Sequence, residues 1–228
     1  MPTAVDTTDE IRERFFARGD GAEAIAARTA AVDEIVRREF ARAFDGEGVP
    51  PVMVAAVGGY GRSQLFPHSD IDLLFLFERQ PDADAEKERL ARLLTNLWDQ
   101  KLRISQSVRT PAECSSLAAD NAELHVSLLD ARFLAGDGRL FDNLSLSLLP
   151  KFYLREQKSL MRQLMEMARE RHQKFGDTIY HLEPNIKESP GGLRDFQLAC
   201  WIAQLANVSD RHVPRTEEFL PEIGRAHV

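Results

Sequence analysis

VMVAAVGGYGRSQLFPHSDIDLLFLF, residues 52–77, is the stretch that decides the fold. It holds two apolar runs, residues 52–57 and 70–77, whose length and content of β-branched and aromatic side chains are typical of buried strands. A glycine-rich turn follows the first run and leads into a loop or one short helix. The sequence therefore predicts two adjacent strands that are joined through a glycine turn.

Two carboxylates, Asp70 and Asp72, stand at the start of the second run. Successive side chains of a strand alternate between its faces, so these two project from the same side. Carboxylates this close repel each other, which raises their pKa unless a cation lies between them. Mg²⁺ prefers oxygen ligands and commonly joins carboxylates to substrate phosphates, with Mn²⁺ as a substitute. We predict that both aspartates are catalytic metal ligands; the alternative is a polar strand start at the surface.

The glycines of the turn point to a phosphate site. Gly58, Gly59 and Gly61 would let backbone N–H groups approach phosphate oxygens without a side chain in the way, although an ordinary tight turn explains them as well. Arg62 would contact the triphosphate or form an ion pair with a nearby acid. Ser69 would donate a hydrogen bond to the nucleotide or to a catalytic carboxylate. All five are predicted nucleotide-binding residues.

The string GGYGRSQLFPHSDIDLL, which begins at Gly58, resembles the DNA polymerase β-type nucleotidyltransferases. More narrowly, it resembles the N-terminal region of the bacterial PII uridylyltransferases, the bifunctional uridylyltransferase/uridylyl-removing enzymes. A second string, LEPNIKESPGGLRD at residues 182–195, is similar to that family's Glu-Pro-Asn-x-Lys-x-x-Pro-Gly-Gly-Leu-Arg-Asp block, and SVRT at 107–110 is a weaker match. The similarity runs over residues 52–205.

The second string forms a constrained turn before an expected helix, whose N-terminus favours an anion. Its predicted nucleotide-binding residues are Asn185, Lys187, Gly191, Gly192 and Arg194. The alternative interpretation is structural, with Arg194 and Asp195 paired with each other. The charged run at residues 169–174 is expected to be a solvated helix face.

One feature departs from the superfamily pattern, in which most members carry a third carboxylate on the next strand. The strand expected here, within residues 101–109, has no acidic residue. Asp99 before it and Glu113 after it are the nearby acids, and their spacing places neither of them at the site.

Hydrophobic patterning predicts an α/β (α+β) fold, with a small mixed sheet that carries the nucleotidyltransferase site and a mainly helical region after it. The expected parts are N-terminal helices in residues 1–50, the nucleotidyltransferase core in 51–110 and a helical region in 111–228 with the second motif. Within that last region, helices are expected over residues 124–134, 140–174 and 193–205. The resemblance implies a fragment or short relative that lacks the family's HD and ACT domains.

The composition limits the kinds of partner and the cellular compartment that we expect. A net charge of −7 argues against extended nucleic-acid binding, which needs a basic face. No apolar run approaches the roughly 20 residues that span a bilayer, so no membrane partner is expected. The two cysteines, Cys114 and Cys200, are expected to be buried thiols in a reducing compartment. We therefore expect a cytoplasmic protein.

The resemblance implies a Mg²⁺-dependent enzyme that transfers UMP from UTP to a tyrosine of the nitrogen-regulatory protein PII and releases pyrophosphate. UTP and PII enter through the resemblance alone. Two alternatives stay open: a related nucleotidyltransferase with another donor or acceptor, for example in protein adenylylation, and a catalytically silent nucleotide-sensing module, which the missing third carboxylate favours.

Overall fold

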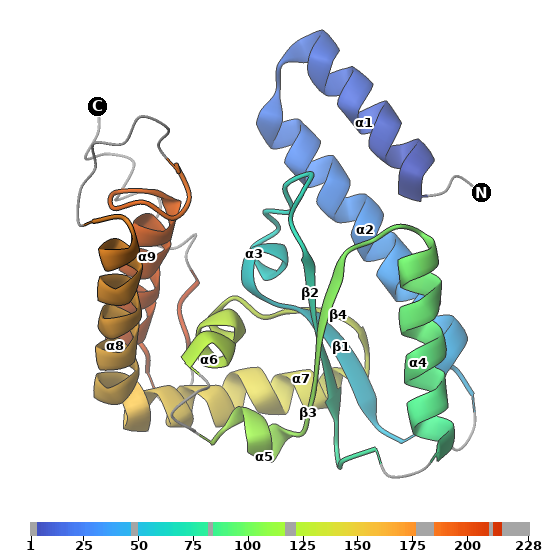
Figure 1. Ribbon diagram of the computed structural model, residues 1–228. Helices are drawn as coiled ribbons and strands as arrows, with labels where there is room; N and C mark the ends of the chain where they lie inside the picture. The colour runs from blue at the N-terminus through green and yellow to red at the C-terminus, as the bar shows by residue number, and fades with distance from the viewer. Residues whose placement is uncertain are drawn as a thin grey trace. The chain divides into compact units, whose positions relative to one another are not determined.

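The computed structural model describes residues 4–46, 50–81, 84–116, 122–176, 185–209 and 212–215. Contacts within the chain divide it into two compact units (Figure 1). The first unit holds the described residues up to Cys114 together with residues 130–144. The second holds residues 115–129 and those from Ser145 onward.

A four-stranded mixed sheet forms the centre of the first unit. Its strands are β1 (Val52–Ala56), β2 (Ile71–Phe77), β3 (Ile104–Arg109) and β4 (Arg132–Gly136), in the spatial order β3-β2-β1-β4. β1 runs antiparallel to both β2 and β4, whereas β2 and β3 are parallel. The predicted mixed sheet and its first three strands are confirmed.

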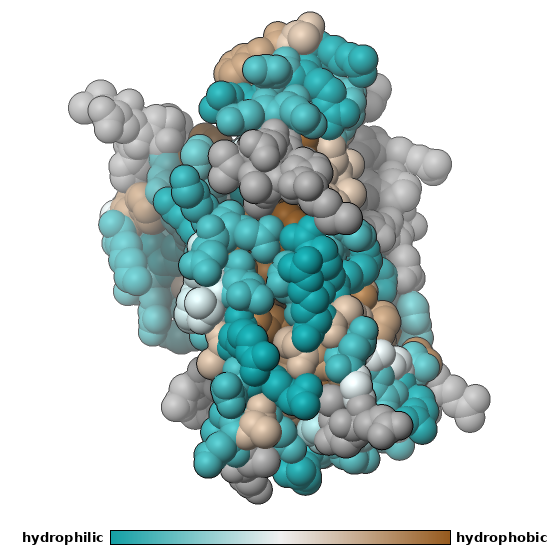
Figure 2. All heavy atoms as spheres, turned by 90° about the vertical axis from the view of Figure 1, so that its right-hand side faces the viewer, coloured by the Kyte–Doolittle hydropathy of each residue, from teal (hydrophilic) through white to brown (hydrophobic). Residues whose placement is uncertain are grey.

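The first unit also contains helices. They are α1 (Ala4–Arg18), α2 (Gly21–Phe44), α3 (Gly58–Gly61), α4 (Asp84–Asp99), α5 (Pro111–Cys114) and α7 (Gly138–Asn143). The Asp20 carboxylate accepts a hydrogen bond of 2.9 Å from the Glu23 amide, which fixes the start of α2. On the face drawn in Figure 2, hydrophilic residues predominate and hydrophobic ones show as small separate areas.

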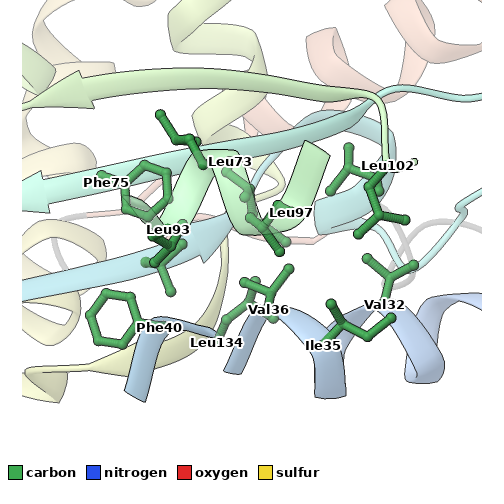
Figure 3. Close-up of a cluster of buried hydrophobic side chains, with 14 of the residues drawn as sticks. Val32, Ile35, Val36, Phe40, Leu73, Phe75, Leu93, Leu97, Leu102 and Leu134 are labelled. Carbon is green, nitrogen blue, oxygen red and sulfur yellow. The ribbon is translucent and has the colours of Figure 1, made fainter. Parts of the chain in front are cut away.

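Alternate residues of β2 face opposite sides of the sheet. Leu73 and Phe75 pack into one buried cluster with side chains of α2 and α4, as Figure 3 shows. Leu74 and Leu76 are also fully buried but do not belong to that cluster. Because side chains alternate along a strand, Asp72 projects on the face opposite to α2 and α4.

The helix predicted over residues 124–134 is wrong in its C-terminal part. Helix α6 covers Ala122–Leu129, and the chain then extends as β4. Pairing with β1 decides the conformation here, since Ala135 lies opposite Val54 and Gly136 opposite Met53. Long-range strand pairing has overridden the local helical pattern. Through β4, residues 130–144 belong to the first unit, although residues 115–129 between them and Cys114 belong to the second. The first unit is therefore made of two separate stretches of sequence, whereas the expected parts were each continuous.

The described part of the second unit is helical, as predicted. Besides α6 it contains α8 (Leu149–Lys174) and α9 (Leu193–Ala206), and the π-helical segment Leu144–Leu148 leads into it. The Tyr153 hydroxyl donates to the His125 carbonyl at 2.8 Å and so ties α8 to α6. The extended segment predicted at residues 178–182 lies outside the described residues.

The state of the two cysteines agrees with the expectation drawn from composition. Cys114 and Cys200 are both buried free thiols, as predicted. None of the helices in the described part of the chain is long and apolar enough to span a membrane.

Candidate functional site

The glycine turn and the aspartates come together at the edge of the sheet where β1 ends and β2 begins. Asp72 is the second residue of β2, and the Val57 amide donates to its backbone carbonyl at 3.1 Å. A Cβ added to Gly58 would lie 3.3 Å from Asp72 Oδ2, and Gly58 adopts a left-handed φ of +58°. The carboxylate therefore lies directly against the turn, where a side chain at residue 58 would crowd it.

Asp70 lies exposed just before β2 and forms no ion pair with a described residue. An exposed, uncompensated carboxylate two residues from Asp72 suits a hard divalent cation, which prefers oxygen ligands. The chain would then supply two ligands, and phosphate oxygens and water would complete the coordination. The two aspartates thus fit the predicted Mg²⁺, whose binding remains a prediction.

Helix α3 is one short turn whose carbonyls are used within the loop. The carbonyls of Val57, Gly58 and Gly59 accept hydrogen bonds from later amides of the loop, at 3.0, 3.1 and 2.9 Å. The amides of Gly58 and Gly59, in contrast, donate to no residue that the structure describes. Backbone N–H groups at the start of a helical turn attract anions. This geometry is compatible with the predicted phosphate contact.

Gly61, unlike Gly58 and Gly59, is closely packed against backbone atoms of other segments. A Cβ at this position would lie 2.1 Å from the Asp130 carbonyl oxygen and 3.0 Å from that of Ala56. Backbone on both sides therefore excludes any side chain. Close packing explains this glycine, and its contact with a nucleotide remains a prediction.

Arg62 forms an ion pair with an acidic residue, which was the expected alternative to a phosphate contact. Its Nη1 atom pairs with Asp130 Oδ2, and the two side chains are 10% and 2% exposed. A Cβ on Gly59 would lie 3.8 Å from the Nη2 atom of Arg62, so the guanidinium stays beside the glycine turn. Ser69 is half-buried immediately before Asp70, and its amide donates to the Phe66 carbonyl at 3.0 Å.

A buried polar network behind the turn was missed by sequence reasoning. The Tyr60 hydroxyl donates to Asp33 Oδ1 at 2.7 Å, and Arg132 donates to both carboxylate oxygens of Asp33, at 2.7 and 3.0 Å. Burial raises the pKa of the Tyr60 phenol, and the charge of Asp33 raises it further. The sequence signal was an aspartate on the mainly apolar inner face of α2, which also holds Thr29 and Glu39.

The third carboxylate of the superfamily pattern has no counterpart at this site in the described chain. The β2–β3 register places Ser105 opposite Asp72. Glu113 accepts from the Thr110 amide at 2.8 Å and hydroxyl at 3.0 Å, which caps the start of α5. Asp99 is exposed at the end of α4. The described residues contain no group of three His, Cys, Asp or Glu that could hold a metal ion.

The second motif folds into a compact loop within the second unit. Asn185 Oδ1 accepts hydrogen bonds from the Lys187 and Glu188 amides, both at 3.0 Å. A Cβ on Gly192 would lie 2.8 Å from the carbonyl oxygens of Ile186 and Ser189. Asn185 and Gly192 thus shape the loop itself, whereas the Lys187 side chain is exposed.

The first amides of α9 are already used by this loop. The Leu193 amide donates to Ile186 at 2.9 Å, and the Arg194 amide donates to Lys187 at 3.0 Å. The Gly191 amide donates to Asp195 Oδ2 at 2.6 Å. Because these donors are engaged, an anion at this helix start would have to bind to side chains such as Lys187.

The pairing of Arg194 with Asp195, which the alternative structural interpretation of this motif expected, is wrong. Asp195 pairs with Arg171 Nη2 at 2.5 Å and His172 Nε2 at 2.9 Å, both on α8. Arg194 instead contacts Glu188 at 3.4 Å. The Arg171 side chain is 15% exposed, so the charged run at residues 169–174 is not solvated throughout. Burial opposes a fall in the pKa of Asp195, but hydrogen bonds from Arg171, the Gly191 amide and His172 outweigh it and lower the pKa.

Replacing Asp195 by alanine should destabilise the second unit by about 2 kcal/mol, because Arg171 would lose its partner. The lowered pKa means that the carboxylate contributes its stability above the unfolded-state pKa of about 3.9 and loses it as the pH falls through the folded value. The difference between wild type and variant should therefore be constant at pH 5–7, within about 0.5 kcal/mol, and shrink below about pH 4. Urea unfolding followed by Trp201 fluorescence in a Trp98→Phe background would measure it; a difference that does not depend on pH would contradict this account.

The structure thus places the predicted residues in two groups. Gly58, Gly59, Gly61, Arg62, Ser69, Asp70 and Asp72 lie in the first unit. Asn185, Lys187, Gly191, Gly192 and Arg194 lie in the second. Their roles in binding and catalysis remain predictions.

Two protein-family models match the chain. The model described as a nucleotidyltransferase domain matches residues 35–128, which include the glycine turn and both aspartates. The model described as GlnD PII-uridylyltransferase matches residues 159–223, which include the loop of the second motif.

Similar proteins from three bacteria share the name bifunctional uridylyltransferase/uridylyl-removing enzyme. The one from Cupriavidus pinatubonensis is 39% identical over 200 residues, which are 87% of this chain and 23% of the relative. The one from Xanthomonas campestris is 41% identical over 82% of this chain and 21% of the relative. The one from Burkholderia pseudomallei is 44% identical over 70% of this chain and 18% of the relative.

The chain therefore spans between 18% and 23% of the length of these curated relatives. The resemblance predicted from the sequence is confirmed, and so is the expected nucleotidyltransferase domain. Over most of its length, the chain is similar to the bacterial bifunctional uridylyltransferase/uridylyl-removing enzymes, and residues 35–128 match the nucleotidyltransferase domain.

Proposed function

We propose that the chain transfers UMP from UTP to a tyrosine of a PII signalling protein and releases pyrophosphate, with Mg²⁺ as cofactor. The observation that carries the proposal is the Asp72 carboxylate lying against Gly58, with Asp70 exposed and uncompensated beside it. Homology to proteins named for uridylyl transfer supports the choice of donor and acceptor.

In the first unit, the aspartates would bind the metal and the glycine amides would bind the phosphates. Asp70 and Asp72 would hold Mg²⁺, which when bound neutralises triphosphate charge and lowers the pKa of the attacking hydroxyl. The Gly58 and Gly59 amides would donate to phosphate oxygens and orient the α-phosphorus. The tyrosine oxygen bonds to that phosphorus, the α–β anhydride bond breaks, pyrophosphate leaves, and the phenolic proton passes to water.

The decisive experiment measures pyrophosphate release from UTP and Mg²⁺, with and without purified PII, and repeats it with ATP. Release that requires PII and prefers UTP is the expected result. Release with ATP and another acceptor would instead support a related nucleotidyltransferase. A full-length relative should run in parallel as a positive control for the PII preparation.

A second candidate, a nucleotide-binding module without catalysis, is favoured by one observation. Ser105 of β3 stands opposite Asp72, and β3 has no acidic residue, whereas most members of the superfamily carry one on the next strand. This candidate expects UTP binding that persists in Asp72→Asn and no pyrophosphate release under any condition. Calorimetric titration of UTP, run beside the release assay, separates the two candidates.

A further inference from the structure

We propose that Asp33 is a positioning residue for the nucleotide: through Tyr60 and Arg132 it holds the Gly58–Gly61 turn in the conformation that presents its amides to the triphosphate. This inference rests on the proposed function, because it needs a phosphate at the turn. Asp33 lies outside every motif that the sequence offered.

Asp33 is buried, at 7% exposure, and its carboxylate is surrounded by donors from three elements. Tyr60 of α3 donates at 2.7 Å to Oδ1. Arg132 of β4 donates at 3.0 Å to Oδ1 and at 2.7 Å to Oδ2, and Arg37 of α2 donates to Oδ2 at 3.4 Å. One carboxylate thus joins the glycine turn to a long helix and to the edge of the sheet.

Besides binding Asp33, Arg132 also forms hydrogen bonds with the backbone of the turn. Its Nε atom donates to the Gly61 carbonyl and its Nη2 atom to the Tyr60 carbonyl, each at 3.3 Å. In a helical turn the carbonyls point along the axis in the direction opposite to the amides. Fixing the carbonyls of residues 60 and 61 therefore aims the Gly58 and Gly59 amides at the other end of the turn.

A turn with three glycines needs such an anchor, because glycine populates both signs of φ. Donors that must be ordered when the ligand arrives bind it more weakly than donors that are already in place. The anchoring network is buried behind the turn, while the two amides donate to no described residue. We therefore expect the network to act on nucleotide affinity through the turn, without touching the nucleotide.

The competing explanation is that Asp33 only stabilises the fold, and Glu39 supplies the matched control. Glu39 lies on the same helix at 2% exposure and pairs with Arg42 at 2.9 Å and with Arg38 at 3.1 Å. Its hydrogen-bond partners Arg38, Arg42 and Asn96 all lie outside the glycine turn. Asp33→Asn and Glu39→Gln each replace a buried carboxylate by an amide of the same shape, so their losses of thermal stability should be similar.

The test compares UTP dissociation constants in Mg²⁺ and KM values for UTP among wild type, Asp33→Asn and Glu39→Gln. Asp33→Asn should weaken UTP binding about tenfold, the effect of one hydrogen bond to a charged group, and KM should rise with it. Glu39→Gln should leave both values within about twofold of wild type. Tyr60→Phe, which keeps the Asp33–Arg132 pair, should give a smaller change in the same direction and serves if Asp33→Asn does not fold. Equal effects of Asp33→Asn and Glu39→Gln, or none from either, would overturn the proposal.

Inorganic tripolyphosphate separates this inference from the proposed function. It presents the same phosphate chain but has no base and no nucleotide to transfer. If wild type does not transfer UMP but binds tripolyphosphate more tightly than Asp33→Asn does, the function fails and the positioning role stands. If wild type binds neither tripolyphosphate nor UTP, the positioning role is wrong.

Discussion

Asp72→Ala should abolish nucleotidyl transfer, lowering kcat/KM by about 10³-fold or more, because the site would lose a ligand of Mg²⁺, whose positive charge would stabilise the transferring phosphoryl group. The carboxylate lies 3.3 Å from the position of a Cβ on Gly58, and Asp72 is the one acidic residue of β2. Asp70→Ala should have a comparable effect. Pyrophosphate release at saturating UTP, Mg²⁺ and PII measures both.

The same variants should keep their fold without metal. Removing one of two neighbouring carboxylates relieves their repulsion, so the Tm of the metal-free protein should hold or rise. Stabilisation by added Mg²⁺ and UTP should disappear, since binding to the native state raises Tm by mass action. Asp99→Ala, an exposed acid on α4, should retain transfer. A marked fall in the metal-free Tm of Asp72→Ala would identify the carboxylate as structural.

Gly61→Ala should destabilise the first unit by about 3 kcal/mol, at the upper end of the usual range for overpacking. The new Cβ would lie 2.1 Å from the Asp130 carbonyl oxygen and 3.0 Å from that of Ala56, and neither backbone group can move independently of the sheet. For a domain of this size the loss corresponds to a fall in Tm of about 6–12 °C. Thermal unfolding followed by Trp98 fluorescence in a Trp201→Phe background would measure it.

Gly59→Ala is the control for this loss, because its Cβ would meet only ordinary contacts at 3.8 Å, from Arg62 Nη2 and the Gln64 carbonyl. Its Tm should stay within about 2 °C of wild type, while UTP binding weakens because a methyl group enters the phosphate approach. If Gly61→Ala were as stable as Gly59→Ala, the close approach of residue 130 to the turn would be wrong.

The sequence was informative about the sheet where the signal is local. The apolar runs that became β1 and β2 are each bounded by turn residues, and their content of branched and aromatic side chains identifies them as strands. β4 had no such signal, because its residues become a strand only through pairing with β1, about 80 residues earlier in the chain. Such a contact overrides local propensity and cannot be read from a short window.

At the site, too, features close in sequence were predicted and contacts between residues distant in sequence were missed. The spacing of the glycines and Asp72 correctly predicted that they lie together. The anchors of the turn were missed because they are distant in sequence: Asp33 is 27 residues from Tyr60, and Asp130 is 68 residues from Arg62. The Asp195 pairing was wrong for a related reason, since its true partner Arg171 lies 24 residues away, whereas Arg194 is merely adjacent.

Because residues 130–144 belong to the first unit, the choice of fragment boundaries decides whether its site stays intact. A fragment that stops at residue 110 would retain every glycine and aspartate of the first motif but lose β4. Asp130 and Arg132 would be lost with it, and these hold Arg62 and Asp33. A fragment that is meant to keep the glycine turn together with its anchoring residues should therefore extend at least to residue 144.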